Sequence, residues 1–296
     1  MDNLDWTLTR SFLAVAETGS LSAAARQLHL SQPTLGRHIA DLESALNLTL
    51  FTRQPRGLAP TEAALALMPH ARSMREAAAK LALAAAGQDE SLAGSVRITA
   101  SRIVAHYILP PMLARLRASE PRLQIDLVAS DDSENLLFRE ADIAVRMYRP
   151  NQLDLITAHL CDMPIGLYAA NSYLSNHPAP HSPDALRPQD FIGFDKSDLI
   201  LRMMHQLGLQ ARREDFALRC DDQIVYWNLV RAGLGIGGMQ TLIGDADPDV
   251  TRIAHFVPLP ALPVWLTAPE ALRQSPRIRR VFDALTASFR ALQLDP

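Results

Sequence analysis

The hydrophobic pattern of this 296-residue chain changes once, across the polar segment 87–94 with the sequence GQDESLAG. Before this segment, apolar residues recur every three or four positions, which is the spacing of amphipathic helices. After it, short aliphatic runs alternate with helical stretches, which is typical of a sheet with helices on its faces. We therefore predict a multidomain α + α/β protein, with a helical N-terminal part and a larger α/β part.

Composition and charge limit the class of protein. With 48% hydrophobic residues the chain can form sizeable cores. No apolar run reaches the roughly 18 residues that cross a bilayer, and the N-terminus MDNLDWTLTR is acidic where a secretory signal is basic. We therefore expect a cytoplasmic protein that does not bind membranes. A net charge of −3 argues against non-specific coating of nucleic acid, but it allows one small DNA-reading domain.

Three short helices are predicted in the first 46 residues. The first ends near Gly19, and the second contains AAARQL with Ser22 as its expected N-cap. Ser31 is the expected cap of the third helix, with Pro33 in its first turn. The third helix has an apolar stripe of Leu35, Ile39, Leu42 and Leu46. Two helices, a tight connection and a third helix of this kind indicate a helix-turn-helix.

A hairpin is predicted directly after this helix-turn-helix. Residues 48–51 are strand-like, a turn with Pro55 and Gly57 follows, and the chain returns toward Thr61. Arg53 and Arg56 lie at the tip. We interpret the hairpin as a wing that touches DNA, although a solvated hairpin with incidental charges has the same pattern.

The polar residues of the third helix lie off its apolar stripe. Glutamine can pair with adenine and arginine with guanine, so we expect Gln32 and Arg37 at or near bases, with Ser31 and Thr34 on phosphates. The predicted DNA-contacting residues are Ser31, Gln32, Pro33, Thr34, Gly36, Arg37, His38, Arg53 and Arg56. The alternative is an ordinary helix with a solvated face.

Gly36 costs the helix about 1 kcal/mol relative to alanine. We expect its missing side chain to let the backbone approach DNA.

The segment FLAVAETGSLSAAARQLHLSQPTLGRHIADLESALNLTLFTR, residues 12–53, resembles the winged helix-turn-helix of the LysR-type transcriptional regulators over its whole length. The matching features include AAARQL in the second helix, SQP at the start of the recognition helix and LFTR at the entry to the wing. The chain departs from the family pattern at Ala59, usually threonine, and at Glu62, usually glycine. This departure concerns the place where the wing meets the next helix.

Residues 61–87 are almost all helix formers, with Thr61 as a cap and Gly87 as a stop. Apolar residues repeat every 3.5 positions, as in the seam of a coiled coil. The predicted seam consists of Leu67, Ala71, Met74, Ala78 and Leu81. A helix lying on its own domain is the alternative. The resemblance implies that this helix pairs two subunits in a homodimer or homotetramer, which predicts a roughly palindromic DNA site.

The α/β part is predicted to contain two series of strands and helices, the second beginning near Cys161. Such alternation predicts open, mostly parallel sheets. Two lobes of this kind look like the periplasmic-binding-protein-like effector domain of the same family. The predicted divisions are a winged domain 1–60, a linker helix 61–87, a hinge 88–94 and an effector domain 95–296. Lobe 1 covers about 95–160 and 266–296, and lobe 2 about 161–265.

In sheets of this type the ligand binds beyond the carboxyl ends of the strands, here between the lobes. The residues at these ends are Ser101, Arg102, Asp131, Arg146, Met147, Asp195 and Asp222, which we predict to contact a small-molecule effector. Ser101 at a helix start suits an anion, whereas the aspartates suit a polar or cationic ligand, so the effector class stays open. Structural salt bridges and caps are the alternative roles for these residues.

Other functions find little support in the sequence. AGLGIGG, residues 232–238, lacks the Lys-Ser/Thr ending of a P-loop, and we find no catalytic triad, metal box or cofactor motif. We expect no enzyme activity, no metal and no cofactor. A solute-binding protein or enzyme with an added helical domain, and a redox sensor using Cys161 or Cys220, are the alternatives. The resemblance implies a DNA-binding regulator with RNA polymerase as a further partner, and it leaves the target genes and the sign of regulation open.

Overall fold

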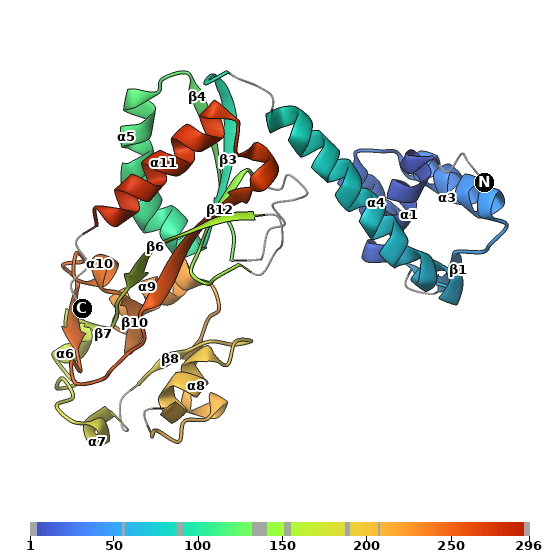
Figure 1. Cartoon of the computed structure of the whole chain (residues 1–296). Coiled ribbons are helices and arrows are strands. Elements are labelled where there is room, and N and C mark those ends of the chain that lie inside the picture. Colours follow the sequence, from blue (N-terminus) through green and yellow to red (C-terminus); the bar gives the residue numbers. More distant parts are fainter. Residues whose placement is uncertain are drawn as a thin grey trace. The chain divides into compact units, whose positions relative to one another are not determined.

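The computed structural model describes residues 5–54, 57–87, 91–131, 141–150, 155–186, 190–206 and 208–292. The chain divides into two compact units, one ending at Ala85 and the other beginning at Ala86. Figure 1 shows the elements of each unit. No helix in the described ranges is long and apolar enough to cross a membrane.

The first unit is a helix-turn-helix followed by a hairpin and a long helix, as predicted. Its elements are α1 (Trp6–Thr18), α2 (Leu21–Leu28), α3 (Gln32–Leu46), β1 (Phe51–Gln54), β2 (Gly57–Pro60) and α4 (Glu62–Gly87). β1 and β2 pair antiparallel and form the wing. The predicted strand at 48–51 begins later than expected, at Phe51.

The N-cap of α2 differs from the prediction. Gly19 ends α1 in a left-handed conformation with φ 65°, and Ser20 then takes an extended conformation immediately before α2. Ser20 is therefore the last residue outside the helix, and its hydroxyl accepts the N–H of Ala23 at 3.4 Å. The prediction of Ser22 as the cap is wrong because Ser22 already lies inside the helix, where its hydroxyl donates to Gln32 Oε1 at 3.2 Å.

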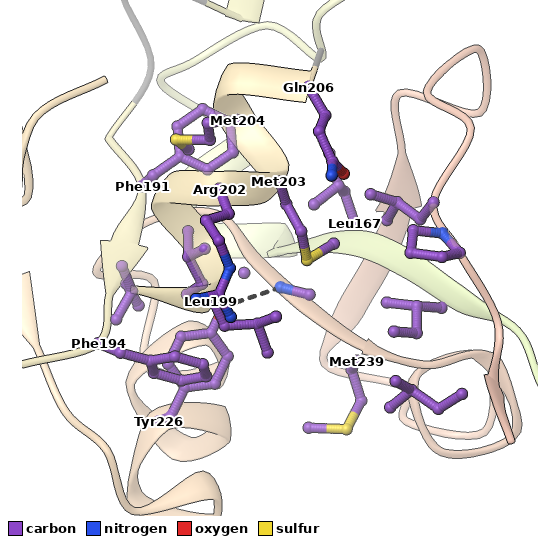
Figure 2. Close-up of a pocket in the computed structure, with 18 of the residues that line it drawn as sticks. Leu167, Phe191, Phe194, Leu199, Arg202, Met203, Met204, Gln206, Tyr226 and Met239 are labelled. Atoms are coloured by element: carbon purple, nitrogen blue, oxygen red, sulfur yellow. Dashed lines mark hydrogen bonds between the residues drawn. The ribbon is translucent and has the colours of Figure 1, made fainter. Parts of the chain in front are cut away.

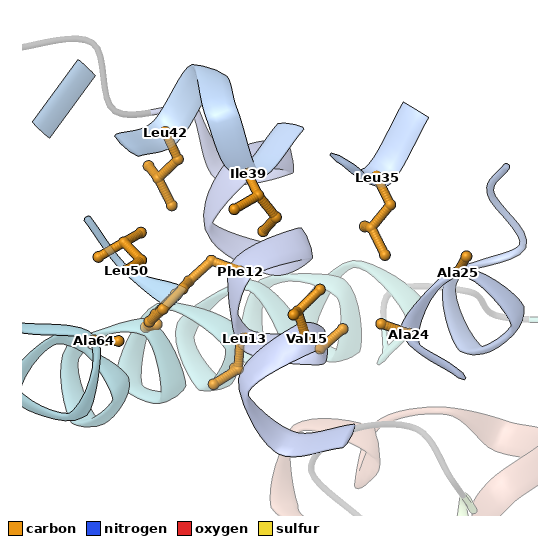
Figure 3. Close-up of a cluster of buried hydrophobic side chains, with 12 residues drawn as sticks. Phe12, Leu13, Val15, Ala24, Ala25, Leu35, Ile39, Leu42, Leu50 and Ala64 are labelled. Atoms are coloured by element: carbon orange, nitrogen blue, oxygen red, sulfur yellow. The ribbon is translucent and has the colours of Figure 1, made fainter. Parts of the chain in front are cut away.

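The core of the first unit forms where α1, α3 and the start of the wing meet (Figure 3). Phe12, Leu35 and Leu50 are almost fully buried there. Burial of a side chain of this size contributes about 1.5–3 kcal/mol. Glu43 links α3 to the start of the wing, because its carboxylate accepts the N–H of Leu50 at 2.6 Å and that of Phe51 at 3.3 Å.

The long helix α4 packs on its own unit at its beginning. Thr61 caps it by accepting the N–H of Ala64 at 3.2 Å, as predicted. Ala71 is buried in the core of this unit and Leu67 packs against it, so the alternative of a helix lying on its own domain describes this end of α4. Farther along, Met74 and Ala78 are half-buried, whereas Leu81 is 75% exposed.

Lobe 1 of the second unit is built on a five-stranded sheet with the order β4-β3-β5-β12-β6. Its strands are β3 (Gly94–Ala100), β4 (Leu123–Ala129), β5 (Ile143–Arg146), β6 (Leu155–Met163) and β12 (Leu262–Pro269). β3 is parallel to β4 and β5, as predicted, whereas β12 is antiparallel to β5 and β6.

Helices pack on this sheet and on one another: η1 (Val104–Ile108), α5 (Leu109–Ser119) and α11 (Pro276–Arg290) (Figure 1). The segment SENLLFRE, residues 133–140, has the sequence pattern of a helix and lies outside the described residues.

Lobe 2 lies between β6 and β12 in the chain. A three-stranded sheet has the order β10-β7-β11, and β8 and β9 form a short parallel pair. The strands are β7 (Ile165–Ala170), β8 (Ile192–Gly193), β9 (Leu218–Arg219), β10 (Gly237–Gln240) and β11 (Val250–Ile253). The helices are α6 (Asn171–Leu174), α7 (Pro183–Leu186), α8 (Leu199–Gln206), α9 (Gln223–Arg231) and α10 (Thr241–Gly244).

The prediction of mostly parallel pairing is wrong for the three-stranded sheet of lobe 2, because β7 enters directly from β6 and runs opposite to both β10 and β11.

Two glycines of the first unit predict opposite changes in stability. Gly57 has φ 131°, and a Cβ there would lie 2.5 Å from the carbonyl oxygen of Gly19. Gly57→Ala should therefore lower the free energy of unfolding by more than about 1 kcal/mol. Nothing lies within 4 Å of a Cβ at Gly36, so Gly36→Ala should raise it by up to about 1 kcal/mol. Denaturant unfolding followed by circular dichroism measures both, and a shift of the same sign in both variants would contradict this account.

Candidate DNA-binding surface and effector site

The first turn of α3 is exposed and capped. Ser31, Gln32, Pro33 and Thr34 are all exposed. The hydroxyl of Ser31 accepts the N–H of Thr34 at 3.2 Å and lies 2.7 Å from the Thr34 hydroxyl. This cap holds the start of the helix in place, where free N–H groups and the positive end of the helix dipole favour an anion such as a phosphate.

Arg37 is the most accessible charged side chain among the predicted contacts on α3. Its side chain is 84% exposed and its Nε lies 3.8 Å from the Asp41 carboxylate, a weak surface pair that a stronger partner can replace. Gly36 beside it leaves open space above the backbone. On the wing, Arg53 is exposed on β1, and Arg56 lies outside the described residues.

Gln32 and His38 already have partners within the first unit. Gln32 Oε1 accepts from Ser22, which links α3 to α2. His38 Nδ1 lies 2.8 Å from the hydroxyl of Ser11, which is buried in α1. The contact occupies Nδ1 and turns the imidazole toward the core, so His38 positions α3 against α1.

The strand ends of lobe 1 bring two predicted effector residues together. Ser101 follows β3, and the N–H of Arg102 donates to the Asp131 carboxylate after β4 at 3.0 Å. The hydroxyl oxygen of Ser101 is buried and has no hydrogen-bond partner within the described part of the chain. A buried hydroxyl without a partner costs about 1–3 kcal/mol, so a polar ligand group would stabilise it.

Arg146 is used inside lobe 1. Its side chain is buried, with one guanidinium nitrogen donating to the Thr99 hydroxyl at 3.1 Å and another to the Ser130 carbonyl at 3.3 Å. These bonds tie the ends of β3, β4 and β5 together. The position therefore favours the structural alternative over a direct effector contact.

Two contacts join lobe 1 to lobe 2 at this edge. Arg102 Nη1 lies 3.1 Å from Asp222 Oδ2, and the Gln240 amide donates to the Met147 sulfur at 3.5 Å. The same Asp222 carboxylate caps α9 by accepting the N–H groups of Ile224 and Val225. The structure thus places Ser101, Arg102, Asp131, Met147 and Asp222 around one junction.

Asp195 and its neighbours form a separate cluster in lobe 2. The Asp195 carboxylate pairs with Arg213. The carboxylate of Asp221 accepts the N–H groups of Asp195, Lys196 and Ser197 at 3.1–3.3 Å. Burial raises the pKa of Asp221, but these bonds outweigh it and leave the pKa lower than usual. The cluster shapes the loop after β8.

Sequence reasoning missed the role of Gln240 and a cavity of about 260 Å³ in lobe 2 (Figure 2). Gln240 follows a glycine-rich run that we interpreted as a turn into a strand, and the cavity-lining residues have the pattern of ordinary core positions. No sequence signal marks either one, because both depend on how separate elements pack.

Metal binding finds no site among the described residues, and one of the two cysteines is poorly suited to redox chemistry. None of their His, Cys, Asp and Glu side chains form a group of three that could hold a metal ion. Burial, followed by the charge of Asp162, raises the pKa of the Cys161 thiol to about 11, which disfavours the reactive thiolate.

Residues 6–65 match the family description "Bacterial regulatory helix-turn-helix protein, lysR family", and residues 89–290 match "LysR substrate binding domain". The chain belongs to the LysR family. This LysR-family protein is therefore a transcriptional regulator with a helix-turn-helix DNA-binding domain and a substrate-binding domain, which confirms the predicted family and function. The expectation that it is a regulator and not an enzyme agrees with this membership.

Similar proteins match along almost the whole chain. The Mau operon transcriptional activator of Paracoccus denitrificans is 30% identical over 285 residues, which cover 94% of each protein. The full-length structure of the Vibrio cholerae virulence activator AphB aligns with a TM-score of 0.61 at 19% identity, covering 96% of this chain and 99% of that one. Full-length CbnR in complex with its target DNA aligns with a TM-score of 0.59 at 21% identity, covering 96% and 100%. The two structures share the fold of this LysR-family regulator.

The two roles of Asp222 can be separated by substitution. Asparagine is as good an N-cap as aspartate, so Asp222→Asn should remove only the exposed pair with Arg102 and change the free energy of unfolding by about 0–1 kcal/mol. Asp222→Ala also removes the cap of α9 and should cost about 1 kcal/mol more. Denaturant unfolding of the two variants measures the difference, and equal losses would show that the cap contributes nothing.

Proposed function

We propose that this LysR-family regulator binds its operator through the first turns of α3 and the wing. The observation that supports this proposal most directly is the exposed, capped start of α3 with the 84% exposed Arg37 one turn further on. An α-helix fits the major groove of DNA, with its N-terminal residues reaching base edges. The structural relative CbnR is known in complex with its target DNA.

Within this surface we assign separate roles. Arg37 and the free amide of Gln32 contact base edges, while Ser31 and Thr34 contact phosphates at the start of the helix. Pro33 holds the first turn without needing a backbone donor, and Gly36 permits close approach. His38 contributes through its position against Ser11, and Arg53 and Arg56 contact the backbone from the wing.

We propose that two copies pair through α4. Leu67 and Ala71 contribute to the core of their own unit, so Met74, Ala78 and Leu81 form the main part of the seam. A leucine that is 75% exposed on a helix is favourable if a partner helix covers it. A two-fold homodimer, or a homotetramer built from two such pairs, reads a roughly palindromic operator.

We propose that the chain has four functional divisions, with boundaries at 1–60, 61–87, 88–94 and 95–296. The lobes of the last division separate near 160 and 265. The regulator would act in the cytoplasm, where it reaches both the chromosome and RNA polymerase.

We propose further that a small-molecule effector acts at the junction of the lobes. Ser101 has a hydroxyl in need of a partner there, and the Arg102–Asp222 pair is exposed enough to exchange for a ligand. An effector that separates or tightens these contacts would favour one arrangement of the lobes over another. Met147 and Asp131 lie at the same edge, while Asp195 acts from the neighbouring loop.

The DNA-binding proposal predicts different effects for two arginines. An operator is first selected from a random duplex library, and footprinting should show two protected half-sites. Arg37→Ala should weaken binding to this operator by about 1–3 kcal/mol and relax its sequence preference. Arg53→Ala should weaken binding to all duplexes by the same factor, whatever their sequence. It should also reduce the slope of log K against log salt by about one. Fluorescence anisotropy across a salt series measures both. Unchanged affinity in Arg37→Ala would remove Arg37 from base reading.

The close-approach role of Gly36 makes a separate prediction. Gly36→Ala should stabilise α3 but weaken operator binding, because the added methyl group projects into open space that DNA would occupy. The same anisotropy assay with the selected operator measures this change. Equal or tighter binding would mean that Gly36 is only a tolerated cost in the helix.

A further inference from the structure

Lobe 2 contains a mostly apolar cavity between α8 and the sheet strands β7 and β10 (Figure 2). Its volume is about 260 Å³. A dry cavity of about 150 Å³ already holds benzene, so this one can hold a single aromatic ring with a short substituent. Apart from Leu262 at the start of β12, the lining residues belong to lobe 2.

The walls of the cavity suit an aromatic ligand. Leu167 of β7 and Leu199 of α8 face it, together with three methionines, Met203, Met204 and Met239. Methionine is flexible and its sulfur makes favourable contacts with aromatic rings. Phe194 and Tyr226, with ring centroids 5.3 Å apart, add an aromatic edge. Leu199 is 41% exposed although it is apolar, and a ligand would cover it.

One buried hydroxyl at this cavity has an unused proton. The Tyr226 side chain is 4% exposed, and its oxygen accepts the N–H of Gly238 at 2.9 Å. Burial raises the pKa of Tyr226 to about 12, so the hydroxyl stays protonated. Its O–H donates to no acceptor in the part of the chain that the structure describes. A ligand oxygen that accepts this hydrogen bond would satisfy the Tyr226 hydroxyl as a donor.

Gln240, at the end of β10, supplies a second polar group. It is 4% exposed, and its amide nitrogen donates to the Met147 sulfur, which leaves its carbonyl oxygen without a donor among the described residues. The cavity thus offers a buried donor, Tyr226, and a buried acceptor, Gln240, within mostly apolar walls that also include Arg202, Gln206 and Gln223.

The charged groups at the cavity favour a neutral ligand over an ionic one. Among the described residues that line it, Arg202 is the only charged one, and its guanidinium already pairs with Asp198, the residue immediately before α8. Burying a second charge there without a partner would be costly. The chemistry therefore favours an uncharged molecule over the anion that Ser101 would suit.

Two residues that line the cavity adjoin contacts between the lobes. Gln240 lines the cavity and contacts Met147 of lobe 1. Gln223 also lines it and directly follows Asp222, which pairs with Arg102 of lobe 1. A ligand that moves either glutamine would change a contact between the lobes.

We propose that this cavity binds an uncharged aromatic molecule with one hydrogen-bonding oxygen, held by the Tyr226 hydroxyl, and that its occupancy changes the contacts between the lobes. The effect on DNA binding rests on the proposed function, whereas the binding site itself does not.

Three probes of similar size test the site by calorimetry on the full-length protein. Acetophenone is neutral and has a carbonyl acceptor, ethylbenzene lacks the acceptor, and benzoate carries a charge. Acetophenone should bind at least tenfold more tightly than benzoate. Tyr226→Phe should weaken the binding of acetophenone by about fivefold, because one net hydrogen bond is lost. The affinity for ethylbenzene should not change. Met203→Trp, which fills the cavity, should abolish the binding of both.

Tyr168→Phe is the matched control. Tyr168 is a buried tyrosine of the same lobe that hydrogen-bonds Asp245 and does not line the cavity, so its loss should leave all three probes unaffected. The site is wrong if benzoate binds more tightly than acetophenone, if no probe binds, or if acetophenone binds the Met203→Trp variant as well as the parent protein.

The proposed effect of the ligand on DNA binding is tested by a separate measurement, the affinity for the operator. Saturating acetophenone should change the affinity of the parent protein for its selected operator and have no effect on Met203→Trp. An unchanged operator affinity with acetophenone bound would overturn the coupling to the lobes. The calorimetric test of the cavity uses no DNA. If the protein failed to bind an operator even in the absence of a probe, that result would count against the proposed DNA-binding function and not against the cavity.

Discussion

Antiparallel pairing between β6 and β12 determines how the two lobes of the substrate-binding domain are joined. The ladder runs from Leu155 paired with Pro269 to Met163 paired with Leu262, with one irregularity near Val264. It places the start of β7 and the end of the lobe 2 chain beside each other at the edge of the lobe 1 sheet. The residues after β3 and β5 therefore meet the start of α9 and the end of β10, which makes the Arg102–Asp222 and Met147–Gln240 contacts possible.

Charge has different roles at the two sites of the molecule. In the winged unit the exposed Arg37 has only a distant surface partner, so its charge is available to an external anion. In the substrate-binding domain Arg146 and Asp222 satisfy backbone and side-chain groups of the protein itself. Two neutral hydroxyls there keep unused hydrogen-bonding capacity among the described residues: that of Ser101, which has no partner, and that of Tyr226, which accepts from Gly238 but does not donate. We therefore expect a ligand at either hydroxyl to be selected by hydrogen bonding and shape more than by charge.

Local chemistry explains which parts of the fold were predictable. Caps at Ser31 and Thr61, the apolar stripe of α3 and the hairpin with Gly57 depend on residues close in sequence, and all were predicted. The cap of α2 was misplaced by two residues because the conformation of Gly19 decides where the helix starts. The antiparallel sheet of lobe 2 was missed because strand direction depends on the path of the chain through β6.

The sequence by itself determined the family, the order of the domains and the polar face of α3, because each depends on residue types at short, fixed spacings. Only the tertiary structure decided which candidate side chains remain available. In the folded protein, His38 contacts Ser11 and Arg146 is buried among strand ends. The first part of the predicted α4 seam packs in the core of its own unit. It also formed the lobe 2 cavity, since an enclosed space requires side chains from β7, α8, α9 and β10 to converge, and no single segment contains that information.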